Sequence, residues 1–251
     1  MPLLGIIIPT WNNNQYLLPC VASVLGTNYE AIHVYVVNNG DAQNMLALPK
    51  DSRITVLQQD RNLGWEGGLK AGLACSKEEF VMFLNDDTFI PPVSKGWIGE
   101  MFTYFGDSKV AAVGPSSNCV MGGQNVFIPF APNQEVLRAK FLIGFCVMLR
   151  RSALDEAGGV DGSLCGGDDL DLSIRLRQHG HDLLIDRKAF VYHHGFKTGE
   201  RVKGGPNMVG GWNSVDMTEK TNFALIRKHG LPVWLDTMSN QILGGYELQQ
   251  A

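Results

Sequence analysis

The sequence Ile6-Ile7-Ile8-Pro9-Thr10-Trp11-Asn12 lies near the start of the chain, and in it an apolar run gives way to polar residues. An unbroken apolar run is typical of a strand that is buried on both faces of a parallel sheet. Open sheets of parallel strands bind ligands at the carboxyl ends of their strands. The polar residues after Ile8 are therefore candidates for a binding site, although a plain connection from strand to helix would use the same residue types.

Apolar runs recur through the first half of the chain and alternate with stretches that have helical spacing. The expected strands are Leu4–Ile8, Ile32–Val37, Ile54–Leu57, Phe80–Leu84 and Val110–Val113. The expected helices between them cover Leu18–Leu25, Gly67–Ala74 and Val93–Phe105. This alternation predicts an α/β fold with a mainly parallel, Rossmann-like sheet and flanking helices.

Beyond Gly114 the pattern is less regular, which predicts a small mixed region on the same sheet. We expect extended segments at Asn125–Phe130, Phe141–Leu149, Leu183–Ile185 and Phe190–Tyr192, a surface loop at Gly195–Gly211, and helices from Ser152 to Gly158-Gly159, over Asp168–Gln178 and within Val215–His229. Neither a repeat nor a linker interrupts the sequence. Residues 1–251 are therefore expected to form a single domain.

The composition excludes several classes of protein. The 251 residues include 21 Lys and Arg against 25 Asp and Glu, so the chain offers no basic field for a nucleic acid. Its five cysteines are dispersed and odd in number, which suits free thiols in a reducing compartment. The chain has neither a signal sequence nor an uncharged apolar stretch of about 20 residues, so we expect a soluble cytoplasmic protein. Peripheral contact with a membrane and the oligomeric state stay open.

Acidic residues follow the fourth expected strand in the sequence Asn85-Asp86-Asp87. Hard divalent cations prefer carboxylate oxygens, and such a cation offsets the charge of a leaving diphosphate. Acidic residues at the end of a strand are also common turn formers. The pair His193-His194 ends the last expected strand, and a histidine there is a candidate metal ligand, although a lone histidine is more often structural.

A second acidic cluster, Asp168-Asp169-Leu170-Asp171, follows the flexible pair Gly166-Gly167 at the start of a helix. Asp168 is expected to act as the helix cap. Asp169 lies beside another carboxylate, which raises its pKa and suits it to accept a proton. Asp171 is expected to face elsewhere and to be structural.

Two further segments could contact a phosphorylated ligand. The sequence from Asn62 to Gly72 places several glycines and Lys70 at a helix start, where bare backbone can approach a ligand, but tight packing of helix on sheet would also select glycine. Lys197, Arg201 and Lys203 in the expected loop could fold over a diphosphate, although solvated surface charge is their default role.

The order of these motifs resembles the family 2 glycosyltransferases, an inverting group with the GT-A fold, and most closely their rhamnosyltransferase-like branch. The resemblance spans about Leu3 to Gly195. It depends on Ile8-Pro9-Thr10-Trp11-Asn12, Asn62-x-Gly64-x-x-Gly67-Gly68, Leu84-Asn85-Asp86-Asp87-Thr88, the segment from Phe145 to Arg151, Asp168-Asp169-x-Asp171-Leu172 and Val191-Tyr192-His193-His194-Gly195.

The resemblance implies a role for individual residues. The implied donor-binding residues are Pro9, Thr10, Asn12, Asn38, Asn62, Gly67, Lys70, Asn85, Asp86 and Arg201. Asp87 and His193 would hold a divalent metal, Mn²⁺ or Mg²⁺, and Asp169 would deprotonate the acceptor. Phe145 and Asp168 would lie on the acceptor side. Residues 1–115 would form the half that binds the nucleotide sugar, and residues 116–251 the acceptor half with its C-terminal helix.

Three residues depart from the family pattern. Asn38 stands where many relatives carry an aspartate that reads the base, so the nature of the base is harder to predict. Asn85 replaces the first acid of the metal motif, which leaves coordination to Asp87 and His193. Asp168 replaces a glutamate and shortens the side chain before the expected base.

We therefore expect an inverting transferase that moves a hexose or deoxyhexose from a UDP- or dTDP-linked donor to a hydroxyl of a glycan or other acceptor, as in polysaccharide biosynthesis. Two alternatives stay open. A sugar nucleotidyltransferase would need an early basic phosphate signature, but the chain has no Lys or Arg before Lys50. A catalytically inactive sugar-nucleotide or glycan-binding module would not need both Asp87 and Asp169.

Overall fold

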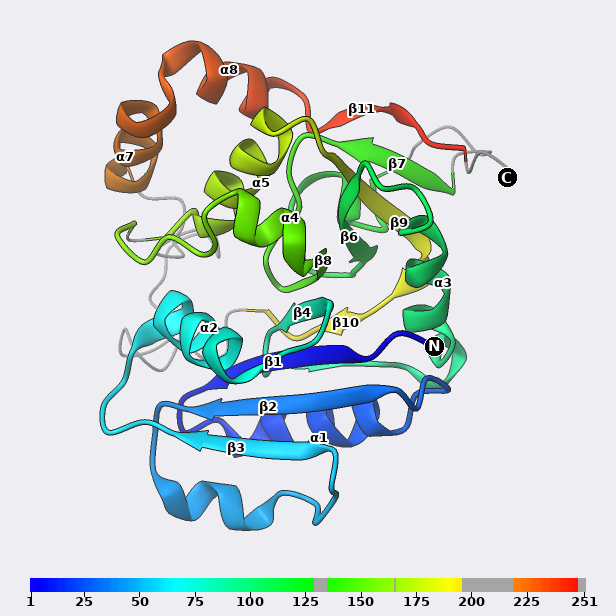
Figure 1. Ribbon diagram of the computed structural model, residues 1–251, viewed down its shortest axis with the longest axis vertical. Helices are drawn as coiled ribbons and strands as arrows, with labels where there is room; N and C mark the ends of the chain where they lie inside the picture. Colours follow the sequence, from blue (N-terminus) through cyan, green and yellow to red (C-terminus); the bar gives the residue numbers. More distant parts are fainter. Residues whose placement is uncertain (129–134, 165, 196–218, 248–251) are drawn as a thin grey trace.

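The computed structural model describes residues 1–128, 135–164, 166–195 and 219–247. Within them, a nine-stranded sheet runs in the order β11-β7-β9-β6-β8-β4-β1-β2-β3 (Figure 1). The strands of this sheet are β1 (Leu4–Thr10), β2 (Ile32–Asn38), β3 (Ile54–Gln58), β4 (Phe80–Leu84), β6 (Val110–Ser116), β7 (Val136–Ala139), β8 (Cys146–Arg150), β9 (Asp182–Phe190) and β11 (Ile242–Gly245). The short strands β5 (Thr88–Phe89) and β10 (Tyr192–His193) pair separately.

The first half of the sheet is parallel and the second half is mixed. β3, β2, β1 and β4 run parallel to one another, and all seven residues of β1 are buried. β8 runs antiparallel between β4 and β6, β9 is parallel to β6, and β7 and β11 close the edge in antiparallel pairs. The predicted α/β fold with a mainly parallel first half and a mixed second half is confirmed.

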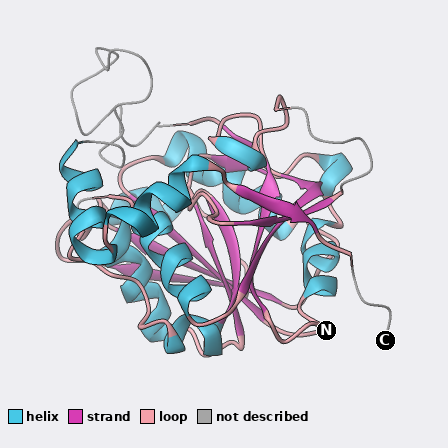
Figure 2. Cartoon of the chain, turned by 90° about the horizontal axis from the view of Figure 1, so that it is seen from above, coloured by secondary structure: helices cyan, strands magenta, loops and turns pink. Residues whose placement is uncertain are grey.

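Helices cover both faces of the sheet (Figure 2). They are α1 (Asn14–Leu25), α2 (Gly64–Cys75), α3 (Trp97–Tyr104), α4 (Arg151–Glu156), α5 (Asp168–Gln178), α7 (Glu219–His229) and α8 (Leu231–Ser239), with 3-10 turns η1 (Ala42–Ala47), η2 (Pro92–Ser94) and η3 (Gly122–Gln124). One core cluster joins α1 and α3 to the sheet, and a second joins α2, α4 and α5 to it. α7 and α8 pack outside α5 through a third, smaller cluster. Among the described residues, no helix is long and apolar enough to cross a bilayer.

Glycines let α2 approach β1 closely. A Cβ on Gly72 would lie 2.4 Å from Cγ2 of Ile7, and one on Gly68 would lie 2.8 Å from Cβ of Pro9. Both neighbours belong to β1, and Ile7 is fully buried. Tight packing of helix on sheet therefore accounts for these two glycines without a ligand.

Gly72→Ala should destabilise the protein even though alanine is the better helix former. We expect overpacking against Ile7 to cost about 1–3 kcal/mol, which outweighs a gain in helix propensity of at most about 1 kcal/mol. Gly99→Ala is the matched control, because its Cβ would meet nothing closer than Cδ2 of Tyr29 at 3.9 Å. Urea unfolding measures both; a Gly72→Ala protein as stable as wild type would contradict the packing account.

Several sequence predictions differ from the structure. Asn125–Phe130 is not extended where it is described, since only Asn125 forms an isolated bridge and a turn follows. Phe141–Leu149 becomes a strand only from Cys146. The strand expected at Leu183–Ile185 is part of the longer β9, which continues through a register shift to Phe190. The strand expected at Phe190–Tyr192 is divided, with Phe190 at the end of β9 and Tyr192 at the start of β10. The strands β5, β7 and β11 were not predicted, because each has four residues or fewer and shows no period, and helix α8 was also not predicted.

Two predictions fall largely outside the described residues. Of the loop expected at Gly195–Gly211, with its cations Lys197, Arg201 and Lys203, only Gly195 is described. The helix expected within Val215–His229 is present from Glu219 onward.

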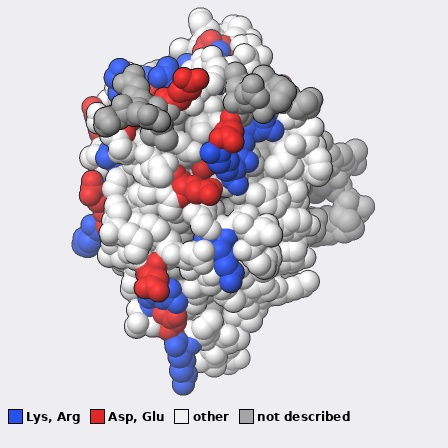
Figure 3. All heavy atoms as spheres, turned by 90° about the vertical axis from the view of Figure 1, so that its right-hand side faces the viewer, with Lys and Arg blue, Asp and Glu red and all other residues white. Residues whose placement is uncertain are grey.

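Charge on the described surface is mixed. On the face shown in Figure 3, basic and acidic side chains are interspersed and broad uncharged areas separate them. A continuous basic band, which a nucleic acid would require, is not present on this face of the described residues.

Candidate active site

The carboxyl ends of β1, β2 and β4 meet at one edge of the sheet, where polar residues of distant segments contact one another. Thr10 at the end of β1 donates from Oγ1 to Oδ2 of Asp86 (2.6 Å), and Nδ2 of Asn13 donates to Oδ1 of Asp86 (3.0 Å). All three side chains are buried. Asp86 is therefore more than a turn former, since it ties the loop after β4 to the loop after β1.

The loop after β2 is held by two asparagines. Asn38 is fully buried; its Nδ2 donates to the carbonyl of Asp41 (3.0 Å) and to Oε1 of Gln58 (2.7 Å), and its Oδ1 accepts from the amide of Gly40 (3.0 Å). Asn12 has a positive φ of 50°, and its Oδ1 accepts from the amide of Asp41 (2.8 Å). Both side chains therefore fix the loop after β2, which lies beside Thr10.

His193 faces Asp87 in a buried pair. Nε2 of His193 lies 3.1 Å from Oδ1 of Asp87 and 3.2 Å from Nδ2 of Asn85. Nδ1 of His193 donates to the carbonyl of Cys119 (2.9 Å), which fixes the ring and aims Nε2 at the carboxylate. The neighbouring His194 is exposed, so the geometry selects His193 of the two histidines as the partner of Asp87.

The electrostatics of this pair suit a cation. Burial is the largest single effect and lowers the pKa of His193, but the hydrogen bond to Asp87, the negative charges of Asp87 and Asp86 and the Cys119 carbonyl together raise it by more, so the net direction is upward from the usual value. This favours a proton shared between an imidazole nitrogen and a carboxylate oxygen. The same two atoms can hold a divalent cation in place of that proton. No set of three or more Cys, His, Asp or Glu side chains is gathered for a metal within the described residues, so a cation here would need oxygens from its substrate.

Asp168 and Asp169 lie at the start of α5, after Gly167, which takes the cap position in a left-handed conformation (φ 72°). The prediction that Asp168 caps the helix is wrong: its Oδ2 accepts instead from Nε1 of Trp65 in α2 (3.1 Å). Asp169 is half-buried; its Oδ2 accepts from the amide of Gly144 (3.1 Å) and its Oδ1 from the amide of Leu170 (2.8 Å).

The segment Gly144-Phe145 connects the two carboxylate sites. The Phe145 carbonyl accepts from the amide of Asn85 (2.8 Å), and its ring stacks on His193 with centroids 5.2 Å apart. Gly144 holds Asp169 through its own amide. One continuous set of contacts therefore leads from Asp87 through His193 and this segment to Asp169.

The glycosyl transferase family 2 model matches residues 5–158, which is more than half of the chain. The chain belongs to glycosyltransferase family 2. An uncharacterized protein of Mycobacterium tuberculosis is 30% identical over 221 residues, covering 80% of this chain and 78% of that protein. The pre-mycofactocin glycosyltransferase of the same species is 27% identical over 204 residues, covering 75% of this chain and 42% of that protein.

Solved glycosyltransferase structures share the fold. A mannosyltransferase from Pyrobaculum calidifontis in complex with GDP-Man and Mn²⁺ aligns with a TM-score of 0.65 at 18% identity, covering 80% of this chain and 59% of that chain. GalNAc-T7 with UDP, GalNAc and Mn²⁺ aligns with a TM-score of 0.63 at 14% identity, covering 77% of this chain and 43% of that chain. This chain spans less than two thirds of either. The GT-A-like fold that the sequence resemblance implied is confirmed.

In this family 2 glycosyltransferase, the donor residues expected on α2 lie apart from the buried contacts. Asn62 is exposed, and its Oδ1 accepts from the amide of Gly64 (2.8 Å). Lys70 is exposed and approaches Gly162, on which a Cβ would lie 3.3 Å from Nζ of Lys70. A Cβ on Gly67 would lie 2.7 Å from Cβ of Leu63, so its bare backbone also serves the local turn.

Phe145, expected on the acceptor side of the transferase, is 2% exposed and packs against His193. In this arrangement its ring supports the histidine. Sequence reasoning gave no role to Asn13, Trp65, Cys119 and Gly144. Cys119 and Gly144 act through main-chain atoms, which have no sequence signature, whereas Trp65 lies inside the motif Asn62-x-Gly64-x-x-Gly67-Gly68.

A crevice opens beside Asp169 between α2, α5 and the sheet of the glycosyltransferase. Half-buried Trp65, Asp168 and Asp169 line it together with the buried apolar side chains of Phe83, Ala112, Leu142, Val147, Leu149, Val160, Leu172 and Leu176. Its polar groups are therefore concentrated near the two carboxylates. A hydroxyl that meets Asp169 here would be partly shielded from water.

Proposed function

We propose that this family 2 glycosyltransferase moves a hexose or deoxyhexose from a nucleoside diphosphate sugar to an acceptor hydroxyl with inversion, and that it belongs to the rhamnosyltransferase-like branch. The observation that carries the proposal is the continuous set of contacts between the Asp87–His193 pair and Asp169. Such an arrangement suits a reaction in which a diphosphate leaves beside one carboxylate while a proton is taken by another. UDP- and dTDP-linked sugars are the expected donors, and a glycan is the expected acceptor.

The donor would lie along the carboxyl ends of β1, β2 and β4. We assign its base and ribose to the surface formed by Pro9, Thr10, Asn12 and Asn38, with Asp86 near the ribose. Asp87 and His193 would hold Mn²⁺ or Mg²⁺, and the remaining coordination positions suit diphosphate oxygens and water, as is usual for Mg²⁺ bound to phosphates. When bound, the metal would stabilise the charge of the leaving diphosphate. Relatives in complex with Mn²⁺ and nucleotides support this assignment.

The acceptor would lie beside Asp169. The carboxylate would take the proton of the acceptor hydroxyl as that oxygen attacks the anomeric carbon and the bond to the diphosphate breaks. Direct displacement needs one base and no covalent intermediate with the enzyme, and Asp169 would supply that base, while the neighbouring Asp168 is engaged by Trp65. Gly144 and Leu170 orient the carboxylate through their amides. We further propose that residues 1–251 act as one catalytic domain with a donor half (1–115) and an acceptor half (116–251).

A donor panel tests the proposal. The full chain is incubated with UDP-, dTDP- and GDP-linked sugars with and without Mn²⁺, and thermal stabilisation and released nucleoside diphosphate are measured. We expect one class of donor to raise the melting temperature only with the metal, and to be hydrolysed slowly. Binding without any release of diphosphate, even with a range of glycan acceptors, would instead support an inactive binding module. A nucleotidyltransferase would release no nucleoside diphosphate and, with added pyrophosphate, would convert the nucleotide sugar into a nucleoside triphosphate and a sugar 1-phosphate.

A further inference from the structure

Asp171 is a buried carboxylate that the proposed reaction does not use. Its side chain is fully buried, and Nε of Arg175 donates to its Oδ2 (2.8 Å). Nζ of Lys228 and Nε2 of His229 each lie 2.7 Å from its Oδ1. Burial is the largest single effect and raises the pKa of Asp171, but the hydrogen bonds from Lys228, Arg175 and His229 and the charge of Arg175 together lower it by more, so the net direction is below the usual value.

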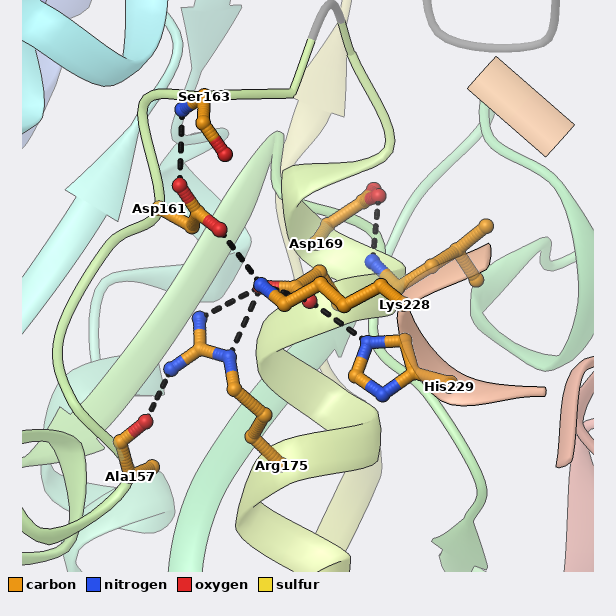
Figure 4. A network of polar contacts seen from close by, with 9 residues as sticks. Ala157, Asp161, Ser163, Asp169, Arg175, Lys228 and His229 are labelled. Carbon is orange, nitrogen blue, oxygen red and sulfur yellow. Dashed lines mark hydrogen bonds and ion pairs between the residues drawn. The ribbon is translucent and has the colours of Figure 1, made fainter. Parts of the chain in front are cut away.

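The same cluster holds the connection that leads into α5 (Figure 4). Nζ of Lys228 lies 2.6 Å from Oδ2 of Asp161, and Oδ1 of Asp161 accepts from the amide of Ser163 (2.8 Å). Arg175 also donates to the carbonyl of Ala157, where that connection begins. Lys228 thus joins α7 both to the connection and to α5 itself.

α7 also covers the turn directly before Asp168. Gly166 and Gly167 have positive φ values of 96° and 72°, a conformation that glycine adopts readily. Because glycine is also conformationally free, the turn needs neighbouring contacts to hold it in place. A Cβ on Gly167 would lie 2.9 Å from Cγ2 of Thr221 and 3.1 Å from Cδ1 of Leu225, both in α7. Leu225 is fully buried. The glycine turn at the start of α5 therefore packs directly against α7.

Asp171 cannot meet a substrate at Asp169, because residues two positions apart on a helix do not face the same side. We propose that Asp171 and Lys228 are positioning residues: they dock α7 on α5 and so hold the glycine turn that sets the place of Asp169. This inference rests on the proposed role of Asp169 as the base. A small displacement of a catalytic group lowers turnover strongly, since the reaction needs a near-attack geometry.

The test uses Lys228→Met in the full chain, with Lys228→Arg as the conservative variant and Lys220→Met, an exposed lysine of the same helix, as control. We expect Lys228→Met to lower kcat on the order of tenfold with donor affinity unchanged. Lys228→Arg should recover most of the rate, and the control should match wild type. Rates are measured well below the melting temperature of each variant, so that a loss of folded protein does not contribute.

Hydrogen exchange supplies a readout that does not depend on activity. Amides of residues 166–170 should exchange faster in Lys228→Met, while those of α2 stay as in wild type. Faster exchange with a normal kcat would show that the cluster only stabilises the fold. A reduced kcat with normal exchange would show that Lys228 affects turnover without holding the glycine turn. Either result overturns the proposal. Near wild-type transfer by Asp169→Asn is a separate outcome, which would remove the base assignment itself.

Discussion

Asp169→Asn is expected to lower the rate of sugar transfer by about 10²–10⁴-fold, because the amide cannot accept the proton of the acceptor hydroxyl. Donor affinity should change little, since Asp169 accepts from the amides of Gly144 and Leu170, whereas the proposed donor surface lies at the ends of β1, β2 and β4. An asparagine oxygen can keep one of these two hydrogen bonds. The free energy of unfolding should therefore fall by only about 0.5–1.5 kcal/mol.

A purely structural role for Asp169 predicts a different result. If the carboxylate only complements the positive end of the helix dipole, its loss should cost roughly 0.3–1 kcal/mol of stability and leave turnover normal. Asp155→Asn, at an exposed site on α4, makes the same change of charge away from the site and is the control. Melting temperature, donor affinity and transfer rate are measured on the same preparations. A folded, donor-binding Asp169→Asn protein with near wild-type transfer would eliminate it as the base.

β1, β2 and β4 could be predicted because these strands are buried along almost their whole length, and β3 keeps a short apolar run although it is only partly buried at the edge of the sheet. An unbroken apolar run such as that of β1 has few other interpretations. The strand itself continues to Thr10, two residues beyond the predicted end at Ile8. The mixed half of the sheet was harder to predict. β7 has four residues with an exposed Arg138 among buried neighbours, and such a short segment shows no period.

The candidate site was predictable to the extent that side chains carry its chemistry. Asp87, Asp169 and His193 could be proposed as candidates because carboxylates and imidazoles at strand and helix ends suggest metal binding and proton transfer. The contacts that orient them come from the Cys119 carbonyl and the Gly144 amide, and any residue type has these groups. Asp168 shows the opposite difficulty: aspartate is a common helix cap, but this side chain forms a hydrogen bond with Trp65, which is distant in the sequence.

Asp87→Ala and His193→Ala are expected to weaken donor binding by about 100-fold or more and to remove its dependence on Mn²⁺. Loss of an outer residue that merely orients a metal ligand costs 10–100-fold in affinity in typical sites, so loss of a direct ligand should cost at least the upper end of that range. The two side chains are both buried and lie 3.1 Å apart. Among the described residues, no third Cys, His, Asp or Glu side chain joins them as a possible metal ligand, so neither can be replaced by a neighbour. Titration calorimetry with the donor, with and without Mn²⁺, measures the effect.

His194→Ala is the matched control for this experiment, because it removes an exposed imidazole one residue away from the pair and should leave donor affinity unchanged. Each variant also needs a melting curve, since removing one member of a buried pair leaves the other without its partner at a cost of about 1–3 kcal/mol. A variant that melts lower but binds the donor as tightly as wild type would assign the pair a structural role alone. If wild-type protein binds the donor equally well in excess chelator, the metal assignment is wrong. The charge of the diphosphate would then be offset by protein groups and not by a cation held between Asp87 and His193.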